Sequence, residues 1–196
     1  MTDQTVATTA GFKTLVEVGP DHLGQVRDIE ARFQEALAPS AQTYRFGPVQ
    51  QAAKDLPDGS IVRIIPGFGL QEQAPAHVMV LTLKEAVRQA LTRPFGNEAF
   101  WERAEEALTR VFVGLGEQQD APHLVFTATD ADSTGYDYHL LFALQDEETE
   151  GFVYVIAFSV HVTVGLGRDA VLALAVEDTA PFAIRLDALC VRQPLR

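Results

Sequence analysis

The stretch YDYHLLFALQDEETEGFVYVIAFSVHVTV, residues 136–164, decides the fold. It contains two β-patterned runs, 136–145 and 152–164, joined by the acidic segment DEETEG. Because alternate residues of a strand point to opposite faces, each run presents two stripes. The first stripe carries no charge and comprises Tyr136, Tyr138, Leu140, Phe142, Leu144, Phe152, Tyr154, Ile156, Phe158, Val160, Val162 and Val164. The second stripe is only mildly polar and comprises Asp137, His139, Leu141, Ala143, Val153, Val155, Ala157, Ser159, His161 and Thr163. A solvent-facing hairpin would carry Lys, Glu and Thr on this face. Both faces must therefore be covered, or must meet something apolar.

The composition limits the classes of protein that this chain can represent. Its 196 residues, 47% of them hydrophobic, suit one domain with a substantial core and exclude a disordered chain. The formal net charge of −12 argues against nucleic acid as a partner and against adsorption to anionic lipid, since both rely on Lys and Arg. A zwitterionic membrane stays open. Cys190 is alone, so the chain forms no intrachain disulfide, and a buried thiol is expected.

The N-terminus predicts a protein that is made in the cytoplasm of the producer and then released. Residues 1–12 lack a basic region followed by an apolar core, so no signal peptide is visible. No run reaches the roughly 18 apolar residues of a membrane helix. If the protein contacts a target-cell membrane, it must arrive soluble and then change conformation.

The periodicity predicts an order of elements along the chain. A strand at 12–18 is followed by a helix that opens at Gly19-Pro20-Asp21 and stops at Pro39, and by a short helix at 48–55. A strand at 61–65 is expected to end at the segment PGFG, residues 66–69. The remaining predictions are helices at 76–92 and 97–115, with Trp101 in the core, and strands at 123–129, 136–145, 152–164, 170–177 and 182–191.

This order indicates the α+β class, because strands cluster at the end of the chain after the helices. The predicted architecture is a three-layer α/β/α sandwich, in which a mainly antiparallel sheet is wrapped by two helical hairpins. Residues 1–11 are expected to form a flexible N-terminus, and residues 12–196 a single domain.

Motifs that would carry catalysis or a cofactor fail in their context. Gly165-Leu166-Gly167-Arg168-Asp169-Ala170 fits a dinucleotide pattern, but a strand rather than a helix is predicted to follow it. The acidic turn at 130–135 resembles the start of a calcium loop, yet Leu141 stands where that loop needs a Glu. We therefore expect no cofactor, no catalytic residue and no enzyme activity.

Three histidines, His123, His139 and His161, fall on strands that could be neighbours. A metal or acid–base site would need ligand spacing, or a carboxylate that joins the histidines reliably, and the sequence shows neither. Partly buried, hydrogen-bonded histidines are the favoured interpretation, with no metal.

The end of the chain carries a family resemblance. Tyr136-x-Tyr138 leads to LLFALQ (140–145), and VYV (153–155) is followed by FSVHVTV (158–164) and VLALAVEDTAPF (171–182). FQEALAPS (33–40) resembles the end of a first helix, and the chain closes on Leu189 and Gln193-Pro194-Leu195. Over roughly residues 12–195 the chain resembles the cytolytic δ-endotoxin (Cyt) family of pore-forming toxins.

The resemblance implies a mainly antiparallel sheet wrapped by two helical hairpins, and non-enzymatic permeabilisation of bilayers. It implies a zwitterionic phospholipid membrane as partner, a monomer in solution and a homo-oligomer on the membrane. Helices would swing off the sheet, which then meets or enters the bilayer. The candidate lipid-facing residues are Tyr138, Leu140, Phe142, Phe152, Tyr154, Ile156, Phe158, Val160 and Val162. The candidate water-facing residues of a pore are His139, Ser159, His161 and Thr163.

The lengths of the runs are compatible with insertion. Thirteen residues at about 3.3 Å each, tilted near 45°, project to about 30 Å, the thickness of the hydrocarbon core. We expect the Gly165–Asp169 end to lead, because the other end of the sheet is predicted to carry the acidic tip together with Glu177 and Asp178. The alternative is a non-lytic protein that holds an acyl chain or another lipid on the same fold.

Overall fold

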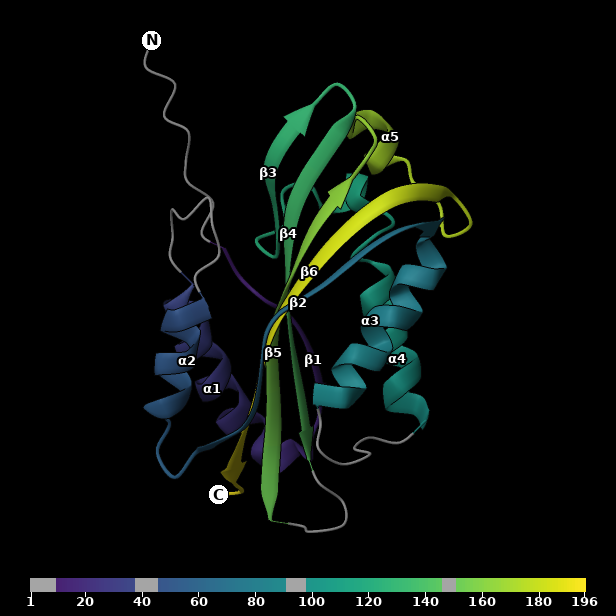
Figure 1. Cartoon of the computed structure of the whole chain (residues 1–196). Helices are drawn as coiled ribbons and strands as arrows, with labels where there is room; N and C mark the ends of the chain where they lie inside the picture. Colours follow the sequence, from purple (N-terminus) through teal and green to yellow (C-terminus); the bar gives the residue numbers. More distant parts are fainter. Residues whose placement is uncertain (1–9, 38–45, 91–97, 146–150) are drawn as a thin grey trace.

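The computed structural model describes residues 10–37, 46–90, 98–145 and 151–196. A twisted sheet lies between two pairs of helices, which confirms the predicted three-layer α+β architecture (Figure 1). Residues 1–9 of the predicted flexible N-terminus lie outside the described residues, as do the acidic residues 146–150. Residues 10 and 11 contact the rest of the fold. The amide of Gly11 donates to the carbonyl of Pro122 at 2.8 Å, and the side chain of Gln34 donates to the carbonyl of Ala10 at 2.7 Å.

The sheet has six strands in the order β1-β4-β5-β6-β2, and β3 also pairs with β4. β1 runs parallel to β4, and the other pairs are antiparallel. The strands are β1 (Lys13–Glu17), β2 (Ser60–Pro75), β3 (Leu124–Asp130), β4 (Ser133–Gln145), β5 (Phe152–Val164) and β6 (Thr179–Pro194). β4, β5 and β6 are therefore central strands, and β2 forms an edge.

The β4–β5 pair follows the pattern of the opening stretch. Aromatic and β-branched residues favour a pleated, buried surface. The two strands stay in register from Thr134 opposite Val164 to Gln145 opposite Val153. Since residues directly opposite one another share a face, the uncharged stripe of β4 meets the uncharged stripe of β5.

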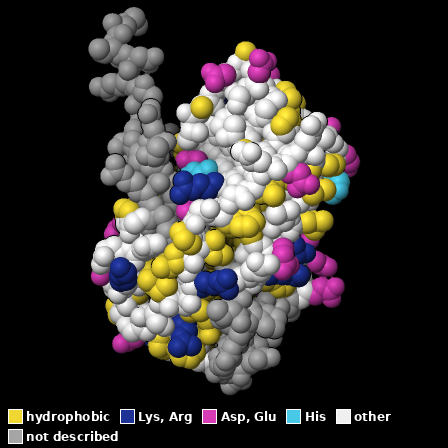
Figure 2. All heavy atoms as spheres, viewed as in Figure 1, with side chains coloured by type: hydrophobic (Ala, Val, Ile, Leu, Met, Phe, Trp, Pro, Cys, Tyr) yellow, Lys and Arg dark blue, Asp and Glu magenta, His cyan; other side chains and the backbone are white. Residues whose placement is uncertain are grey.

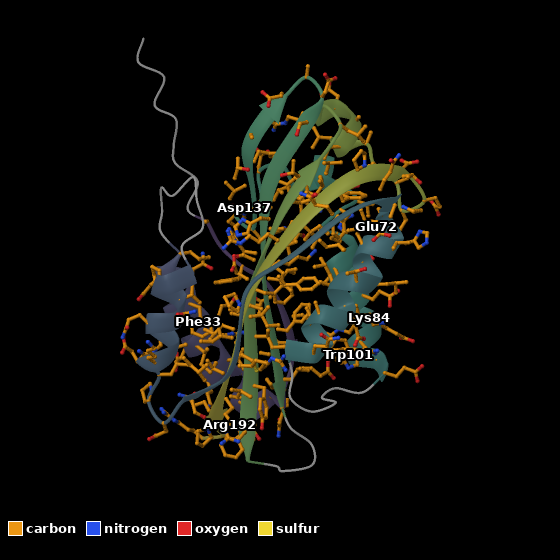
Figure 3. All side chains as sticks on the ribbon, in the orientation of Figure 1. Phe33, Glu72, Lys84, Trp101, Asp137 and Arg192 are labelled. Atoms are coloured by element: carbon orange, nitrogen blue, oxygen red, sulfur yellow. The ribbon has the colours of Figure 1, made fainter. Side chains whose placement is uncertain are left out.

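Two helices cover each face of the sheet (Figure 1). One pair is α1 (Leu23–Ala36) with α2 (Phe46–Lys54), and the other is α3 (Ala76–Ala90) with α4 (Glu98–Thr109). Phe33 of α1 and Trp101 of α4 lie on opposite sides of the sheet (Figure 3). Each helix buries the stripe that its three- and four-residue spacing predicts, such as Val26, Ile29 and Phe33 in α1.

The strand predicted at 61–65 is longer than expected, so its predicted end is wrong. β2 continues past Pro66 and Gly67 to Pro75, with a shift of register between Ile65 and Phe68. Gly67 takes a φ of +64°, which a residue without Cβ adopts at low cost. Pro66 is tolerated because β2 is an edge strand, where one side of the backbone needs no partner. The Pro-Gly pair therefore forms a β-bulge within one long strand.

The predicted strand at 170–177 is also wrong. Arg168–Leu172 form the short helix α5, and a turn follows. A helix thus does follow the two glycines, contrary to prediction. It joins the antiparallel neighbours β5 and β6, however, and not the parallel strands of a dinucleotide-binding unit. Ala and Leu in this segment favour helix, and this propensity prevails over the alternating pattern.

Because residues 168–172 form a helix and not a strand, two carboxylates lie at the opposite end of the sheet from the one predicted. Val164 pairs with Phe182, and Thr179 follows directly on Asp178. Glu177 and Asp178 therefore lie at the end that carries Gly165–Asp169, and not at the end where β4 stops at Gln145 and β5 begins at Phe152. The charge difference that favoured one leading end no longer holds.

The helix predicted at 97–115 is shorter than expected. α4 ends at Thr109, and a 3₁₀ helix follows at Leu115–Gln118. Gly114 is left-handed, with a φ of +66°, and so separates the two segments. Val111, Phe112 and Leu115 nevertheless stay in the core.

Candidate functional site

All nine candidate lipid-facing residues lie on the face of the sheet that α3 and α4 cover. Eight are buried and Phe152 is partly buried. Phe142 is the centre of this packing, because its ring contacts that of Phe158 with centroids 5.0 Å apart and that of Phe100 of α4 at 5.9 Å. We name this surface the β4–β5 apolar face. In this structure α3 and α4 shield it from water.

The contacts between the α3–α4 hairpin and the sheet are mainly apolar. Met79 and Leu83 of α3 and Phe100 and Ala104 of α4 pack into the same core as the β4–β5 apolar face. In the described part of the chain, one ion pair joins α4 to a strand, between Arg103 and Glu17 of β1. Apolar contacts of this kind can be exchanged for lipid contacts without stranding a polar group.

Two buried tyrosines fasten the segment after α4 to the sheet. The hydroxyl of Tyr136 donates to the carbonyl of Val111 at 2.9 Å, and that of Tyr138 donates to Oε1 of Gln118 at 2.6 Å. Burial raises the pKa of Tyr136 far above its ordinary range, so this hydroxyl stays a donor. The segment after α4 is therefore held by hydrogen bonds, whereas the helices themselves are held mainly by packing.

The four candidate water-facing residues lie on the opposite face, toward α1 and α2. His139 is buried, and its Nδ1 lies 2.5 Å from Oγ of buried Ser159. His161 is partly buried, and Thr163 is exposed. The structure brings His139, Ser159 and His161 together on neighbouring strands, whereas His123 contacts Tyr138 on the face that α3 and α4 cover. The three histidines thus do not form one site.

Sequence reasoning missed the two carboxylates at this place. Nδ1 of His161 lies 2.6 Å from Oδ1 of Asp137, and its Nε2 lies 3.2 Å from Oδ2 of Asp187. Asp187 also accepts from the amide of Gly67 at 2.9 Å and lies 3.6 Å from Nε of Arg185. In the sequence, each of these carboxylates is an acidic residue at an inward-facing position of a strand. In the sheet, Asp137 pairs with His161 and Asp187 pairs with Ser159.

The electrostatics make this a charged cluster. Burial by itself would lower the pKa of His161, but the hydrogen bonds to Asp137 and Asp187 outweigh it and raise the pKa to about 9. Burial lowers the pKa of His139 to about 4. Asp137 lies above α1 and α2 in the view of Figure 3, and it is buried, with 6% of its surface exposed. Within the described ranges, no group of three or more His, Cys, Asp or Glu side chains is arranged to hold a metal.

An apolar groove of about 580 Å³ lies between β2 and α3. Phe68 of β2 and Leu81 of α3 line it, with 43% and 53% of their surfaces exposed. Figure 2 shows hydrophobic side chains gathered across the middle of this face, where β2 crosses the molecule. Exposed apolar side chains that line a groove are frequent at contact sites for proteins, lipids or small apolar ligands.

None of the helices within the described ranges is both long and apolar enough to cross a bilayer.

The fold is that of the δ-endotoxins. The chain superposes on a solved structure described as a delta-endotoxin with a TM-score of 0.91 and 26% identity, covering 95% of this chain and 82% of that one. It superposes on the activated Cyt2Ba monomer of Bacillus thuringiensis subsp. israelensis with a TM-score of 0.90 and 26% identity, covering 95% and 100%.

The family model described as Bacillus thuringiensis toxin matches residues 2–196, and the chain belongs to this family. A type-2Aa cytolytic delta-endotoxin of B. thuringiensis subsp. kyushuensis is 27% identical over 184 residues, which cover 94% of this chain and 71% of that protein. A type-2Ba cytolytic delta-endotoxin of subsp. israelensis is 27% identical, with 94% and 70% covered. The predicted family resemblance is confirmed.

Proposed function

We propose that this protein permeabilises phospholipid bilayers, and that it does so by moving the α3–α4 hairpin away from the β4–β5 apolar face. The observation that carries the proposal is the chemistry of this face. Its strands are 13 residues long, its stripe is uncharged, and mainly apolar packing joins it to the hairpin. Once exposed, such a face is costly in water and favourable in lipid.

In this mechanism the monomer is soluble and the membrane form is an oligomer. Strands cross a bilayer only when every backbone hydrogen bond is satisfied, which requires neighbouring strands from other copies. The nine residues of the β4–β5 apolar face would contact lipid. His139, Ser159, His161 and Thr163, on the other face, would contact water. The net charge of −12 favours a zwitterionic over an anionic membrane.

The groove between β2 and α3 is a suitable first contact with lipid. It presents Phe68 and Leu81 to solvent, and α3 forms one of its walls. Acyl chains that enter the groove would replace contacts between α3 and β2. Lipid binding there and loosening of the hairpin are therefore coupled in this mechanism.

Trp101 supplies an intrinsic probe, because it is the one tryptophan of the chain and is buried in α4. We expect phosphatidylcholine vesicles to release a trapped dye in the presence of the protein. We also expect brominated phosphatidylcholine to quench Trp101 emission with the same time course. Leakage in which Trp101 keeps its buried emission and is not quenched would contradict movement of the hairpin.

A non-lytic lipid-binding protein is the second candidate, and the same groove favours it. A volume of about 580 Å³ lies within the range of small-molecule sites. This function predicts saturable binding of a fatty acid with no dye release at micromolar protein. Dye release from pure phosphatidylcholine vesicles decides for the lytic function.

A further inference from the structure

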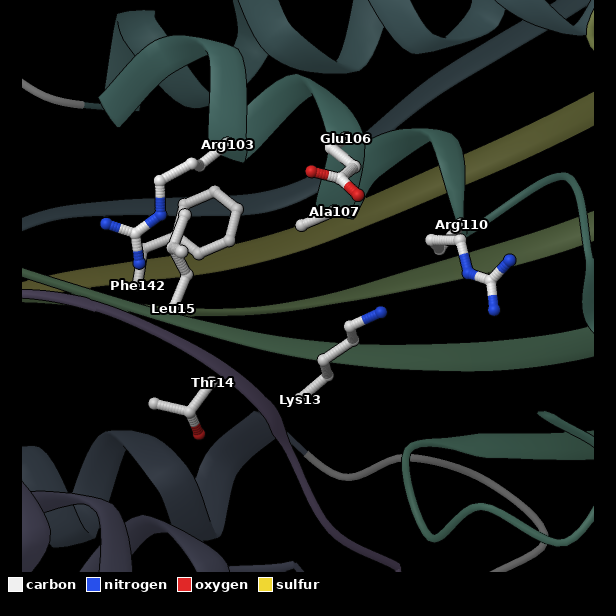
Figure 4. A pocket seen from close by; sticks show the side chains of 8 residues that line it. All are labelled: Lys13, Thr14, Leu15, Arg103, Glu106, Ala107, Arg110 and Phe142. Atoms are coloured by element: carbon white, nitrogen blue, oxygen red, sulfur yellow. The ribbon is translucent and has the colours of Figure 1, made fainter. Parts of the chain in front are cut away.

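A pocket of about 370 Å³ lies between β1 and α4, away from the groove described above. The charged residues Lys13, Arg103, Glu106 and Arg110 border it, as Figure 4 shows. The other lining residues are Thr14, Leu15, Ala107 and Phe142. We name it the β1–α4 pocket. It combines apolar walls with three cations in a chain whose formal net charge is −12.

The cations of this pocket are incompletely neutralised. Arg103 pairs with Glu17, and Arg110 pairs with Glu117 at 2.8 Å, but neither glutamate lines the pocket and the Glu117 side chain is 75% exposed. Exposed ion pairs of this kind are weak and exchange readily with solvent. For the Lys13 ammonium, the described residues supply no hydrogen bond or ion pair. Glu106 is the single carboxylate in the lining.

Neighbouring groups respond to this positive charge. Burial lowers the pKa of Lys13, and the nearby Arg110 lowers it further against the opposing influence of Glu106. Burial lowers the pKa of His123 to about 4, and Lys13 and Arg110 contribute to that shift. An anion between Lys13 and Arg110 would relieve the repulsion between the two cations.

We propose that the β1–α4 pocket binds a phosphate group. Arg presents a planar set of donors that matches phosphate oxygens, and Lys adds a compact charge, so Lys13 and Arg110 suit this group. The pocket volume lies near the lower end of the range for small-molecule sites. It therefore suits a headgroup rather than a whole lipid. A phosphate there would also compete with Glu17 for Arg103, and so would weaken the ion pair between α4 and β1.

Glu106 selects among phosphate sources. Its carboxylate lines the same space as the Lys13 side chain (Figure 4). There it would repel a phosphate dianion and attract the ammonium group of a zwitterionic headgroup. The preferred ligand is thus a phosphodiester that carries a cation, as in a phosphatidylcholine headgroup. This source rests on the proposed function, whereas phosphate binding itself does not.

The test is a titration followed by NMR, with the amides of Lys13 and Arg110 as reporters. The probes are glycerophosphocholine and inorganic phosphate, and the variants are K13Q, R110Q and E106Q. R32Q is the matched control, because it removes one positive charge at an exposed position of α1. We expect glycerophosphocholine to bind wild type and R32Q alike, and K13Q and R110Q to weaken this binding at least tenfold. E106Q should keep phosphate binding and lose the preference for glycerophosphocholine.

Several outcomes separate this inference from the proposed function. If neither probe shifts the reporter amides of the wild type, or if K13Q and R110Q bind like R32Q, the pocket does not bind phosphate. Unchanged association of K13Q with phosphatidylcholine vesicles, despite lost binding of glycerophosphocholine, would overturn the lipid as the source and leave a soluble phosphate ester. Dye release without probe binding would contradict only the inference that the β1–α4 pocket binds phosphate. Probe binding without dye release overturns only the lytic function.

Discussion

Nδ1 of His161 donates a hydrogen bond to Oδ1 of Asp137 at 2.6 Å, directly across the β4–β5 pair. Its other ring nitrogen, Nε2, donates to Asp187 of β6 at 3.2 Å. One protonated imidazole thus joins three central strands, between two carboxylates that are each nearly buried. The arrangement links β4, β5 and β6 in the middle of the sheet and stabilises the fold.

Replacing His161 should destabilise the fold. H161Q removes the positive charge and leaves Asp137 and Asp187 close together without a cation between them. Loss of one partner from a buried ion pair costs a few kcal/mol, so we expect the free energy of unfolding to fall by about 2–3 kcal/mol. Urea denaturation followed by Trp101 fluorescence measures it. T163S, at an exposed position of the same stripe, is the control and should change little. Equal stability of H161Q and wild type would contradict this account.

The same cluster predicts loss of stability at alkaline pH. The pKa of His161 is about 9 in the fold, against 6.5 for an unperturbed histidine. Below pH 6.5 both the folded and the unfolded chain are protonated, and the stabilisation is complete. Between pH 6.5 and 9 the unfolded chain loses its proton first, so the stabilisation declines, by an amount on the order of 3 kcal/mol. Urea titrations across this range should show the decline in wild type and a flatter profile in H161Q.

On the acidic side His139 and His123 act in the opposite direction. Burial lowers the pKa of each to about 4, so both are neutral in the fold at pH 6.5. As pH falls from 6.5 to 4 the unfolded chain binds protons that the folded chain does not, and stability is lost. The melting temperature should therefore pass through a maximum near pH 6.5. H139Q should reduce the slope between pH 4 and 6.5, and an unchanged slope would exclude this role for His139.

The β-bulge of β2 gives a prediction with a matched control. G67A places a side chain at a φ of +64°, and its Cβ would lie 3.2 Å from Nε of Arg185. Left-handed backbone costs a residue with a Cβ roughly 1–2 kcal/mol. G69A lies two residues further on, where the nearest atom would be 3.9 Å away and φ is ordinary. We expect G67A to lower the unfolding free energy by about 1–2 kcal/mol more than G69A does. Equal losses would show that the bulge does not depend on Gly67.

The central hairpin could be predicted because the alternation of residues in the sequence matches the burial of the two strand faces in the structure. Residues 152–164 were predicted as a strand and form β5 with the same bounds. The first stripe is apolar, half of the second is polar, and helices pack on both faces of the pair. The predictions failed where local pattern and tertiary context conflict. Pro66-Gly67 is a strong turn signal locally, yet an edge strand accommodates it as a bulge.

The candidate site was predictable in part, for a related reason. Alternation assigns each residue to a face, so the nine residues of the β4–β5 apolar face share one side as expected. Alternation does not give the pairing of strands that are distant in sequence. The contact between His161 and Asp187 depends on the β5–β6 register and was therefore missed. The β1–α4 pocket depends on a helix that packs beside a strand some 90 residues earlier in the chain, which periodicity cannot show.

Leu81 provides the sharpest test of the groove between β2 and α3. L81D places a carboxylate on a side chain that is 53% exposed, so the fold should lose less than about 1 kcal/mol. The same carboxylate must be desolvated when the groove meets lipid, at a cost of a few kcal/mol. We therefore expect dye release from phosphatidylcholine vesicles to slow at least tenfold. L23D is the matched control, because Leu23 is also exposed, at 37%, but begins α1 on the other face of the sheet. If both variants release dye at the wild-type rate, the groove takes no part in the first contact. If both slow equally, added negative charge rather than the groove is responsible.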